Sequence, residues 1–509
     1  MKKCISIIIS TLLLFSLTGC AAGGAQVTPV SSAPPVASAV AGTALPQQTA
    51  AEPSALPIAD KLAGKALNAF NLDVTLDPEN HTLEVSQLLD YHNSTDTQLS
   101  EIYFNLIPDA FEENGGGIDL SAVTAGGSDA LLQRGEQTVF SMPLSTPLGT
   151  GETLSIQMEY TVRIPDIQNR FGYQENVYNV GNFIITPAVY DENGWAIEPY
   201  ATLGDAFYTD IANYDVAIHA PEGYTVAATG DRQANGSFHA EKVRDFAFCA
   251  SDGYDTLEDT VDGISVTVYY GDNMAKTAAR MMETAKKAIS LYSGMFGAYP
   301  YDTLSVVSSG LTGGVNGMEY PTLIMVGTFV TLDNMEELGI DPAIPEDLAY
   351  CTADIDRAVA HEIAHQWFYG VVGNDQIRYP WLDEGLCRFA EYLYLDAYPV
   401  ENLDDGYSLE QALTFEHQFV MEDNEFGAVD LSLSLYDWQK QEAADYSGIY
   451  NRTASLLYQM RVQMGETAFS KAIKEYVDTF AYGFVTPEGF QQFWNGKDDF
   501  SELFTLYFQ

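Results

Sequence analysis

The stretch His361-Glu362-Ile363-Ala364-His365 decides how the second half of the chain folds and what it holds. Histidines four residues apart lie one turn apart on the same face of an α-helix, where both imidazoles can bind one metal ion. Glu362 lies beside them and could take a proton from a water molecule. Only 7 histidines occur in 509 residues, so chance rarely produces this spacing. We therefore predict a metal site on a helix over 352–370; the alternative is a surface helix that carries a Glu–His pair.

A third ligand is predicted in Trp381-Leu382-Asp383-Glu384-Gly385, where a second helical pattern begins. Turn signals at 373–375 and 379–380 let the chain reverse, so that Glu384 can face the two histidines. Two imidazoles and one carboxylate leave a fourth position open, which is typical of a catalytic zinc. We expect one Zn²⁺ per chain, held by His361, His365 and Glu384.

This His-Glu-x-x-His motif, followed by a Glu within Trp-Leu-x-Glu-Gly, resembles the membrane alanyl aminopeptidase family of zinc metallopeptidases (gluzincins). The resemblance implies a thermolysin-like, mainly helical catalytic domain with a small sheet. It also implies a zinc-dependent aminopeptidase that uses a metal-activated water to hydrolyse the N-terminal residue of peptides. The expected partners are peptides with a free N-terminus. The chain resembles a short member of the family, without the large helical C-terminal domain of longer members.

The segment Asn316-Gly317-Met318-Glu319-Tyr320 resembles the Gly-x-Met-Glu-Asn signature of the same family, and Asn316 and Tyr320 depart from it. The resemblance implies that Glu319 holds the α-amino group of the substrate. A carboxylate beside the scissile bond can pair with an ammonium. Gly317 and Met318 are expected along an edge strand that pairs with the substrate backbone. An acidic insertion near 334–347 separates this segment from the zinc motif, and the alternative role for Glu319 is a solvated surface carboxylate.

The segment Tyr450-Asn451-Arg452-Thr453-Ala454 resembles the family's Tyr-x-Lys-Gly-Ala motif, with Arg452 and Thr453 as departures. The resemblance implies that Tyr450 stabilises the tetrahedral intermediate. Its phenol could donate a hydrogen bond to the developing oxyanion. Tyr446, four residues earlier, is a competitor for this role.

The charge balance excludes one class of partner. The chain has 23 Lys+Arg against 71 Asp+Glu, a formal net charge of −48. A phosphate backbone would be repelled, so we expect no nucleic-acid binding. Anionic lipid headgroups would be repelled too, so attachment to a membrane must be hydrophobic or covalent. Hydrophobic residues make up 46% of the chain, enough for packed cores.

The N-terminus predicts export and a lipid anchor. Lys2 and Lys3 precede the apolar stretch 5–17, which is shorter than the roughly 20 residues of a membrane-spanning helix. Leu17-Thr18-Gly19-Cys20 then resembles the bacterial lipobox. The resemblance implies a lipoprotein signal peptide over 1–19, lipidation of Cys20, and an extracytoplasmic protein anchored to the bacterial cell membrane. The alternative is an ordinary secretory signal that contains a cysteine.

The pattern of the remaining chain predicts an α+β protein with several domains. A flexible Ala/Pro/Ser-rich linker is expected over 20–66, and an antiparallel, mostly-β N-terminal domain over 67–262. The peptidase domain is expected over 263–509. Its elements are a short strand at 304–307 and helices at 275–296, 352–370, 383–397, 449–464, 466–481 and 487–495. Cys249, Cys351 and Cys387 lack metal-type spacing and are expected to be small buried side chains.

Two other functions remain open from the sequence. A metalloendopeptidase of the same fold is favoured if Glu319 is not placed to hold an ammonium. A surface-anchored binding protein with a vestigial peptidase domain is favoured if zinc and hydrolysis are both absent. The complete set of ligands, base and tyrosine favours the aminopeptidase over the binding protein.

Overall fold

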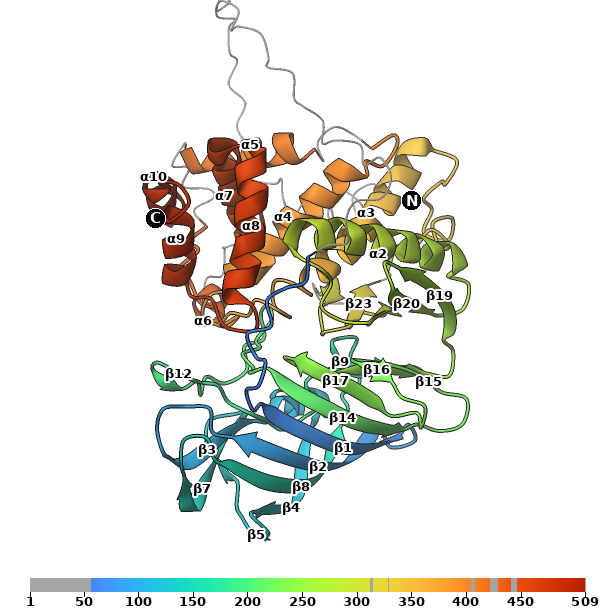
Figure 1. Cartoon of the computed structure of the whole chain (residues 1–509). Helices are drawn as coiled ribbons and strands as arrows, with labels where there is room; N and C mark the ends of the chain where they lie inside the picture. Colours follow the sequence, from blue (N-terminus) through green and yellow to red (C-terminus); the bar gives the residue numbers. More distant parts are fainter. Residues whose placement is uncertain are drawn as a thin grey trace, which may run out of the picture.

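The computed structural model describes residues 56–311, 315–327, 329–403, 408–421, 429–440 and 446–508. The expected signal peptide, Cys20 and most of the expected linker lie outside these residues. Strands form the first half and helices most of the second half, as the sequence predicts (Figure 1). Of the helices in the described ranges, none has both the length and the apolar composition to span a membrane.

The first half is built on an eight-stranded sheet with the order β16-β17-β14-β1-β2-β8-β4-β5. Side chains alternate between buried and exposed along β1, β2 and β8, so one face packs on the core. The pairings are antiparallel except that β1 runs parallel to β14, which the sequence did not predict. The strands are β1 (Asn68–Asp77), β2 (Thr82–His92), β4 (Gly117–Ala125), β5 (Ser128–Asp129), β8 (Thr153–Arg163), β14 (Ala212–His219), β16 (Asp231–Arg232) and β17 (Phe238–Val243).

Two four-stranded sheets and a short hairpin complete this half, with the orders β15-β18-β10-β9, β11-β3-β7-β6 and β12-β13. Their strands are β3 (Leu99–Asn105), β6 (Gln133–Arg134), β7 (Val139–Leu148), β9 (Phe171–Gln174), β10 (Val177–Val180), β11 (Thr186–Pro187), β12 (Tyr190–Asp191), β13 (Gly194–Trp195), β15 (Thr225–Ala228) and β18 (Phe248–Ser251). A 3₁₀ helix, η2, spans Ile107–Asn114.

The second half has a five-stranded sheet with the order β19-β20-β21-β23-β22. Its strands are β19 (Asp255–Val261), β20 (Ile264–Tyr270), β21 (Thr303–Ser309), β22 (Gly317–Met318) and β23 (Leu323–Gly327). The boundary expected after residue 262 falls inside the hairpin of β19 and β20, because alternation alone does not tell which sheet a strand joins. In Figure 1 this sheet lies beneath α2 and α3.

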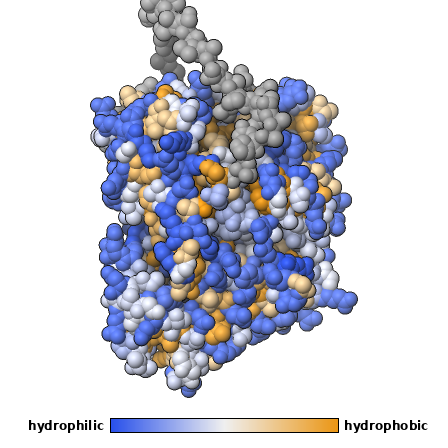
Figure 2. Space-filling model, in the orientation of Figure 1, coloured by the Kyte–Doolittle hydropathy of each residue, from blue (hydrophilic) through white to orange (hydrophobic). Residues whose placement is uncertain are grey.

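The helices lie close to their predicted positions, with one exception. They are α2 (Ala275–Phe296), α3 (Pro345–Ala364), α4 (Trp381–Ala397), α5 (Leu409–Met421), α6 (Leu435–Gln439), α7 (Gly448–Met464), α8 (Glu466–Phe480), α9 (Pro487–Asn495) and α10 (Ser501–Tyr507). The exception is α3, which begins and ends earlier than the expected 352–370. Helices α5, α6 and α10 were not predicted. Figure 2 shows a largely hydrophilic face with scattered apolar side chains.

Arg244 joins the two halves. Its side chain is buried, and its guanidinium donates to the carbonyls of Tyr369 (2.6 Å) and Gly483 (2.7 Å), both from the second half. A β-carbon on Gly373 would lie 2.2 Å from the guanidinium carbon, so glycine leaves the space that Arg244 fills. The guanidinium also lies over the Phe484 ring, 4.6 Å from its centroid. The β-rich half is therefore fixed to the backbone just after the His-Glu-x-x-His segment and to the backbone at Gly483.

Candidate metal centre

Helix α3 positions the two histidines. Pro345 occupies its first turn with Glu346 and Asp347, residues that favour a helix start because proline fits there and acidic groups complement the helix dipole. Ile355, Val359 and Ile363 are buried against the core. His361 lies in the last turn of the helix. His365 lies one turn further along, at the C-cap, where the chain turns towards α4.

Helices α4 and α7 bring Glu384 and Tyr450 together. A β-carbon on Gly385 would lie 2.1 Å from the β-carbon of Thr453, so the two helices approach through this glycine. The approach brings Tyr450 against Glu384, and the phenol donates a 2.6 Å hydrogen bond to Glu384 Oε1. The family departure at Thr453 therefore lies in a helix contact.

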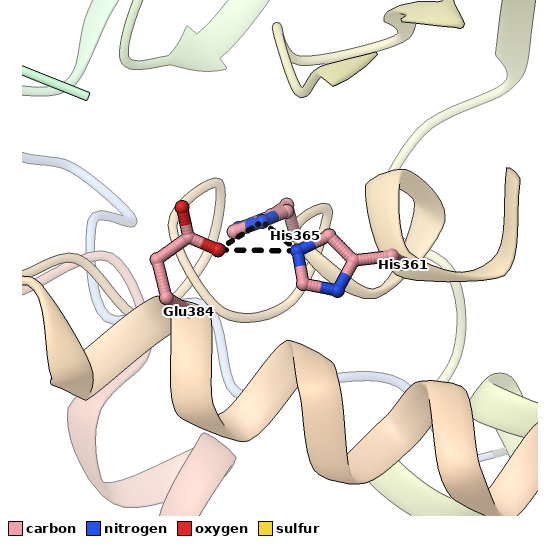
Figure 3. Close-up of side chains that lie close together, drawn as sticks. All are labelled: His361, His365 and Glu384. Atoms are coloured by element: carbon pink, nitrogen blue, oxygen red, sulfur yellow. Dashed lines mark hydrogen bonds and ion pairs between the residues drawn. The ribbon is translucent and has the colours of Figure 1, made fainter. Parts of the chain in front are cut away.

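Nε2 of His361, Nε2 of His365 and Oε2 of Glu384 converge on one point (Figure 3). The two Nε2 atoms are 3.2 Å apart, and they lie 3.1 Å and 3.5 Å from Oε2. In a tetrahedral site with metal–ligand distances of about 2.0–2.1 Å, neighbouring ligand atoms are about 3.3 Å apart. The donor set therefore fits a zinc ion in spacing as well as in chemistry.

The other ring nitrogen of each histidine has its own partner. Nδ1 of His365 lies 3.1 Å from the carbonyl oxygen of Phe368, and Nδ1 of His361 lies 3.4 Å from Oε2 of Glu391. Such acceptors favour a proton on Nδ1 and leave the Nε2 lone pair for a metal. Sequence reasoning missed Glu391, although it follows Glu384 by two helical turns on α4 and so shares its face.

The electrostatics of the site separate two carboxyl groups. Burial would raise the pKa of Glu384, but hydrogen bonds from His361 and His365 hold the pKa well below its ordinary value. Burial raises the pKa of Glu362 to about 8, against the opposing effect of the histidines. A cation held by the three donors would favour the charged form of Glu362. The two carboxyl groups therefore differ: the surroundings favour the charged form of Glu384 and, before a cation binds, the protonated form of Glu362.

Glu362 lies against strand β22. A β-carbon on Gly317 would be 2.0 Å from Oε1 of Glu362, so glycine provides the space for this carboxyl group. Strand β22 is at the edge of its sheet and pairs with β23, as expected for Gly317 and Met318. The Met318 side chain is buried under the sheet, so this residue can offer a substrate its backbone but not its side chain.

Glu319 follows directly after β22 and lies beside the metal donors. Carboxylate oxygens of Glu319 and Glu362 and a nitrogen of His365 all lie within 4.8 Å of one another. Glu319 is only 3% exposed, which excludes the alternative that its side chain is a solvated surface carboxylate. Gln366 fixes the backbone after it: Oε1 accepts from Thr322 N (2.8 Å), and Nε2 donates to the carbonyl of Tyr320 (3.2 Å). The sequence did not reveal the role of Gln366.

The family departure at Tyr320 has a structural reason. The side chain is buried, and its hydroxyl donates a 3.0 Å hydrogen bond to Oδ1 of Asn182 in the β-rich half. A β-carbon on Gly181 would lie 1.8 Å from this hydroxyl, so Gly181 makes room for the ring. Tyr320 thus anchors the segment that carries Glu319 to the first half of the chain.

The β-rich half also contributes charges to the site. Arg170 and Asp205 form a buried ion pair, and the charges of Glu319 and Glu384 both act on Asp205. Burial, followed by Glu319, raises the pKa of Asp205 well above its ordinary value. These residues come from loops more than 100 residues before Glu319, so no local motif reveals them.

Two of the remaining sequence candidates border this cluster: Tyr446 packs edge-on against Tyr450, with ring centroids 6.1 Å apart, and Cys387 is a hydrogen-bond partner of His365. The hydroxyl of Tyr446 lies beside Gly204, where a β-carbon would be 2.6 Å from it. The guanidinium of Arg452 pairs with Glu416 of α5. Cys249, Cys351 and Cys387 are free and buried, as expected.

Comparisons with known proteins agree with this geometry. Residues 280–504 match the model of the peptidase family M1 domain. Aminopeptidase M1-B of Oryza sativa subsp. japonica is 26% identical over 240 residues, covering 45% of this chain and 25% of its own length. Aminopeptidase N of Oryctolagus cuniculus is 32% identical over 133 residues, covering 24% and 13%. The matched region thus spans a quarter or less of these curated relatives.

Solved structures share the fold of both halves. The M1 zinc metallopeptidase from Deinococcus radiodurans superposes with a TM-score of 0.59 at 18% identity, covering 87% of this chain and 92% of that chain. A variant of the same metallopeptidase bound to a Tyr-Ser-Ala substrate gives a TM-score of 0.56 at 18% identity, covering 86% and 92%. The predicted arrangement of a β-rich half followed by a mainly helical half is therefore confirmed.

Proposed function

We propose that the protein is a zinc-dependent aminopeptidase, because residues 280–504 match the peptidase family M1 domain and the metal donors and the candidate base lie together. It would remove the N-terminal residue of peptides that have a free amino group. Zinc, one ion per chain, would be held by His361, His365 and Glu384, whose donor atoms are 3.1–3.5 Å apart.

The proposed roles follow from the contacts. When bound, zinc supplies a Lewis acid that polarises the scissile carbonyl and makes water more acidic. Glu362 takes the proton of the attacking water and passes it to the leaving amine. The Tyr450 hydroxyl donates a hydrogen bond to the developing oxyanion. To do so, the hydroxyl must give up its hydrogen bond to Glu384 Oε1. Strand β22 pairs with the substrate backbone at Gly317.

One observation supports the aminopeptidase proposal: the buried Glu319 carboxylate lies within 4.8 Å of Glu362 and of a ring nitrogen of His365. At that place a carboxylate can bind an ammonium next to the bond that is cut. The charge of Glu319 acts on both members of the Arg170–Asp205 pair, and Tyr320 ties the Glu319 segment to the β-rich half. An endopeptidase would need room there for further residues of the substrate.

The test compares free and blocked substrates. A panel of aminoacyl p-nitroanilides and their N-acetylated forms is assayed with and without a chelator, followed by re-addition of Zn²⁺. We expect hydrolysis of the free amines alone, loss with chelator and recovery with zinc. Comparable cleavage of acetylated peptides would instead identify an endopeptidase. Purified protein without zinc or hydrolysis would support the binding protein with a vestigial site.

We also propose that the protein is exported and anchored through lipid on Cys20. The support is the sequence Leu17-Thr18-Gly19-Cys20 after a short apolar stretch, together with a net charge that disfavours electrostatic attachment to anionic lipid. In a bacterial host, the wild type should incorporate labelled palmitate and sediment with membranes. Cys20→Ala should do neither; a membrane-bound, unlabelled wild type would contradict the proposal.

A further inference from the structure

Arg388 contacts two residues beside the metal centre, Glu391 and Tyr450, which belong to different helices. It lies on α4 one turn after Glu384, and its Nη1 donates to both carboxylate oxygens of Glu391, at 2.7 Å each. Its guanidinium carbon also lies 5.8 Å from the centroid of the Tyr450 ring. The side chain is 18% exposed, so both contacts are partly shielded from water.

The first contact reaches the metal ligand His361. Glu391 accepts from Arg388 and from Nε of Arg357 (2.8 Å), and its other oxygen lies 3.4 Å from Nδ1 of His361. Both arginines donate to the Glu391 carboxylate and fix its position beside Nδ1 of His361. A carboxylate at this place favours a proton on Nδ1 and fixes the ring plane, which presents Nε2 to the metal.

The second contact reaches the proposed oxyanion donor. The Tyr450 ring stacks on the His361 ring at 5.9 Å and has the guanidinium of Arg388 over it. A guanidinium within about 6 Å of an aromatic centroid is attracted to the ring face. Arg388 therefore restricts the ring orientation, and with it the direction in which the Tyr450 hydroxyl points.

We propose that Arg388 is a positioning residue that couples the orientation of His361, through Glu391, to the orientation of Tyr450. The inference rests on the proposed function, because it assigns Tyr450 to the oxyanion. Two effects can then be measured separately. A less well fixed Glu391 weakens zinc binding, whereas a less well fixed Tyr450 lowers kcat of the zinc-saturated enzyme. Arg357 donates to the same carboxylate from α3 and provides the matched control for the first effect.

The experiment compares Arg388→Gln with Arg357→Gln, each in the wild-type chain and in a Tyr450→Phe background. Zinc affinity is measured by chelator competition, and kcat and KM are measured at saturating zinc. We expect both variants to bind zinc about ten-fold more weakly. Only Arg388→Gln should lower kcat, by about ten-fold with little change in KM, and this loss should disappear in the Tyr450→Phe background.

A second measurement does not depend on turnover. Calorimetry of the zinc-loaded protein with a phosphinic dipeptide analogue of the tetrahedral intermediate should show weaker binding to Arg388→Gln than to Arg357→Gln. Arg388→Lys, which keeps a cation near the ring, should restore part of the affinity for the analogue. Equal kcat losses in the two variants, or an Arg388→Gln loss that persists without the Tyr450 hydroxyl, would overturn the coupling. An inactive wild type that binds no analogue would instead reject the proposed function, while the zinc affinities still test the contact with Glu391.

Discussion

The carboxyl group of Glu362 lies directly against the α-carbon of Gly317, so closely that a β-carbon at Gly317 would be 2.0 Å from Oε1. This contact joins the proposed base on α3 to the edge strand that would hold the substrate backbone. It explains why a glycine stands at this place in β22, where no positive φ requires one.

Gly317→Ala should therefore displace Glu362. A misplacement of about 1 Å in a catalytic site can cost about 100-fold in rate, so we expect kcat to fall by roughly that factor. Zinc content should stay at the wild-type level, because the three atoms nearest to the added β-carbon all belong to Glu362 and not to a zinc ligand. The matched control is Gly294→Ala on α2, where a β-carbon has no neighbour within 4 Å. Unchanged kcat in Gly317→Ala would show that Glu362 is not the base.

Tyr450→Phe should lower kcat and leave KM nearly unchanged. Removing one hydrogen-bond donor from an oxyanion site typically costs about 100- to 1,000-fold in kcat. Tyr446→Phe is the control, because its hydroxyl lies beside Gly204 and not on Glu384. Steady-state kinetics of the two variants decide between the tyrosines: if Tyr446→Phe lost the rate and Tyr450→Phe kept it, the assignment would be reversed.

Tyr320→Phe should destabilise the protein and weaken substrate binding. The change leaves Oδ1 of the buried Asn182 without the hydroxyl that donates to it, which typically costs about 1–3 kcal/mol. We expect a lower urea midpoint and a raised KM for free-amine substrates, because the Glu319 segment loses an anchor. In an Asn182→Ala background the same change should cost much less. An additive cost would mean that the two side chains act independently.

The buried Asp245 predicts how stability depends on pH. Burial raises its pKa from 3.8 to about 7. A raised carboxyl pKa means that the folded state holds a proton that the unfolded chain releases. This contribution is full below pH 4 and is lost as the pH rises through 7. Urea unfolding of the zinc-loaded protein at pH 5, 6, 7 and 8 should therefore show a smaller decline in Asp245→Asn than in the wild type. Equal slopes would contradict the shift.

Local patterns predicted the elements that bury a regular face. Apolar residues at helical spacing define α2 over 275–296, and the structure has the same bounds. Helix α3 was expected to begin at 352, and the residues near 334–347 were expected to form an acidic insertion. In the structure, Pro345, Glu346 and Asp347 form its first turn. The expected boundary at 262 lies in the turn between β19 and β20, which alternate alike.

The candidate site was predictable where its members are neighbours in the chain. His361, Glu362 and His365 lie within five consecutive residues at the end of α3. The chain then reverses direction once, and this reversal brings Glu384 of α4 to them. Gln366 and Arg388 lie just after these motifs, but their partners, Tyr320 and Tyr450, are distant in sequence. Arg170 and Asp205 act across the contact between the two halves, which depends on the packing around Arg244 and follows from no local pattern.

The central claim is that a zinc ion on His361, His365 and Glu384 works with Glu362 as the base. Its most direct test measures bound zinc and the turnover of an aminoacyl p-nitroanilide in Glu362→Gln, side by side with the wild type. We expect one zinc per chain in both proteins and a loss of turnover of at least about 100-fold in the variant. Wild-type turnover in Glu362→Gln with zinc bound would contradict it.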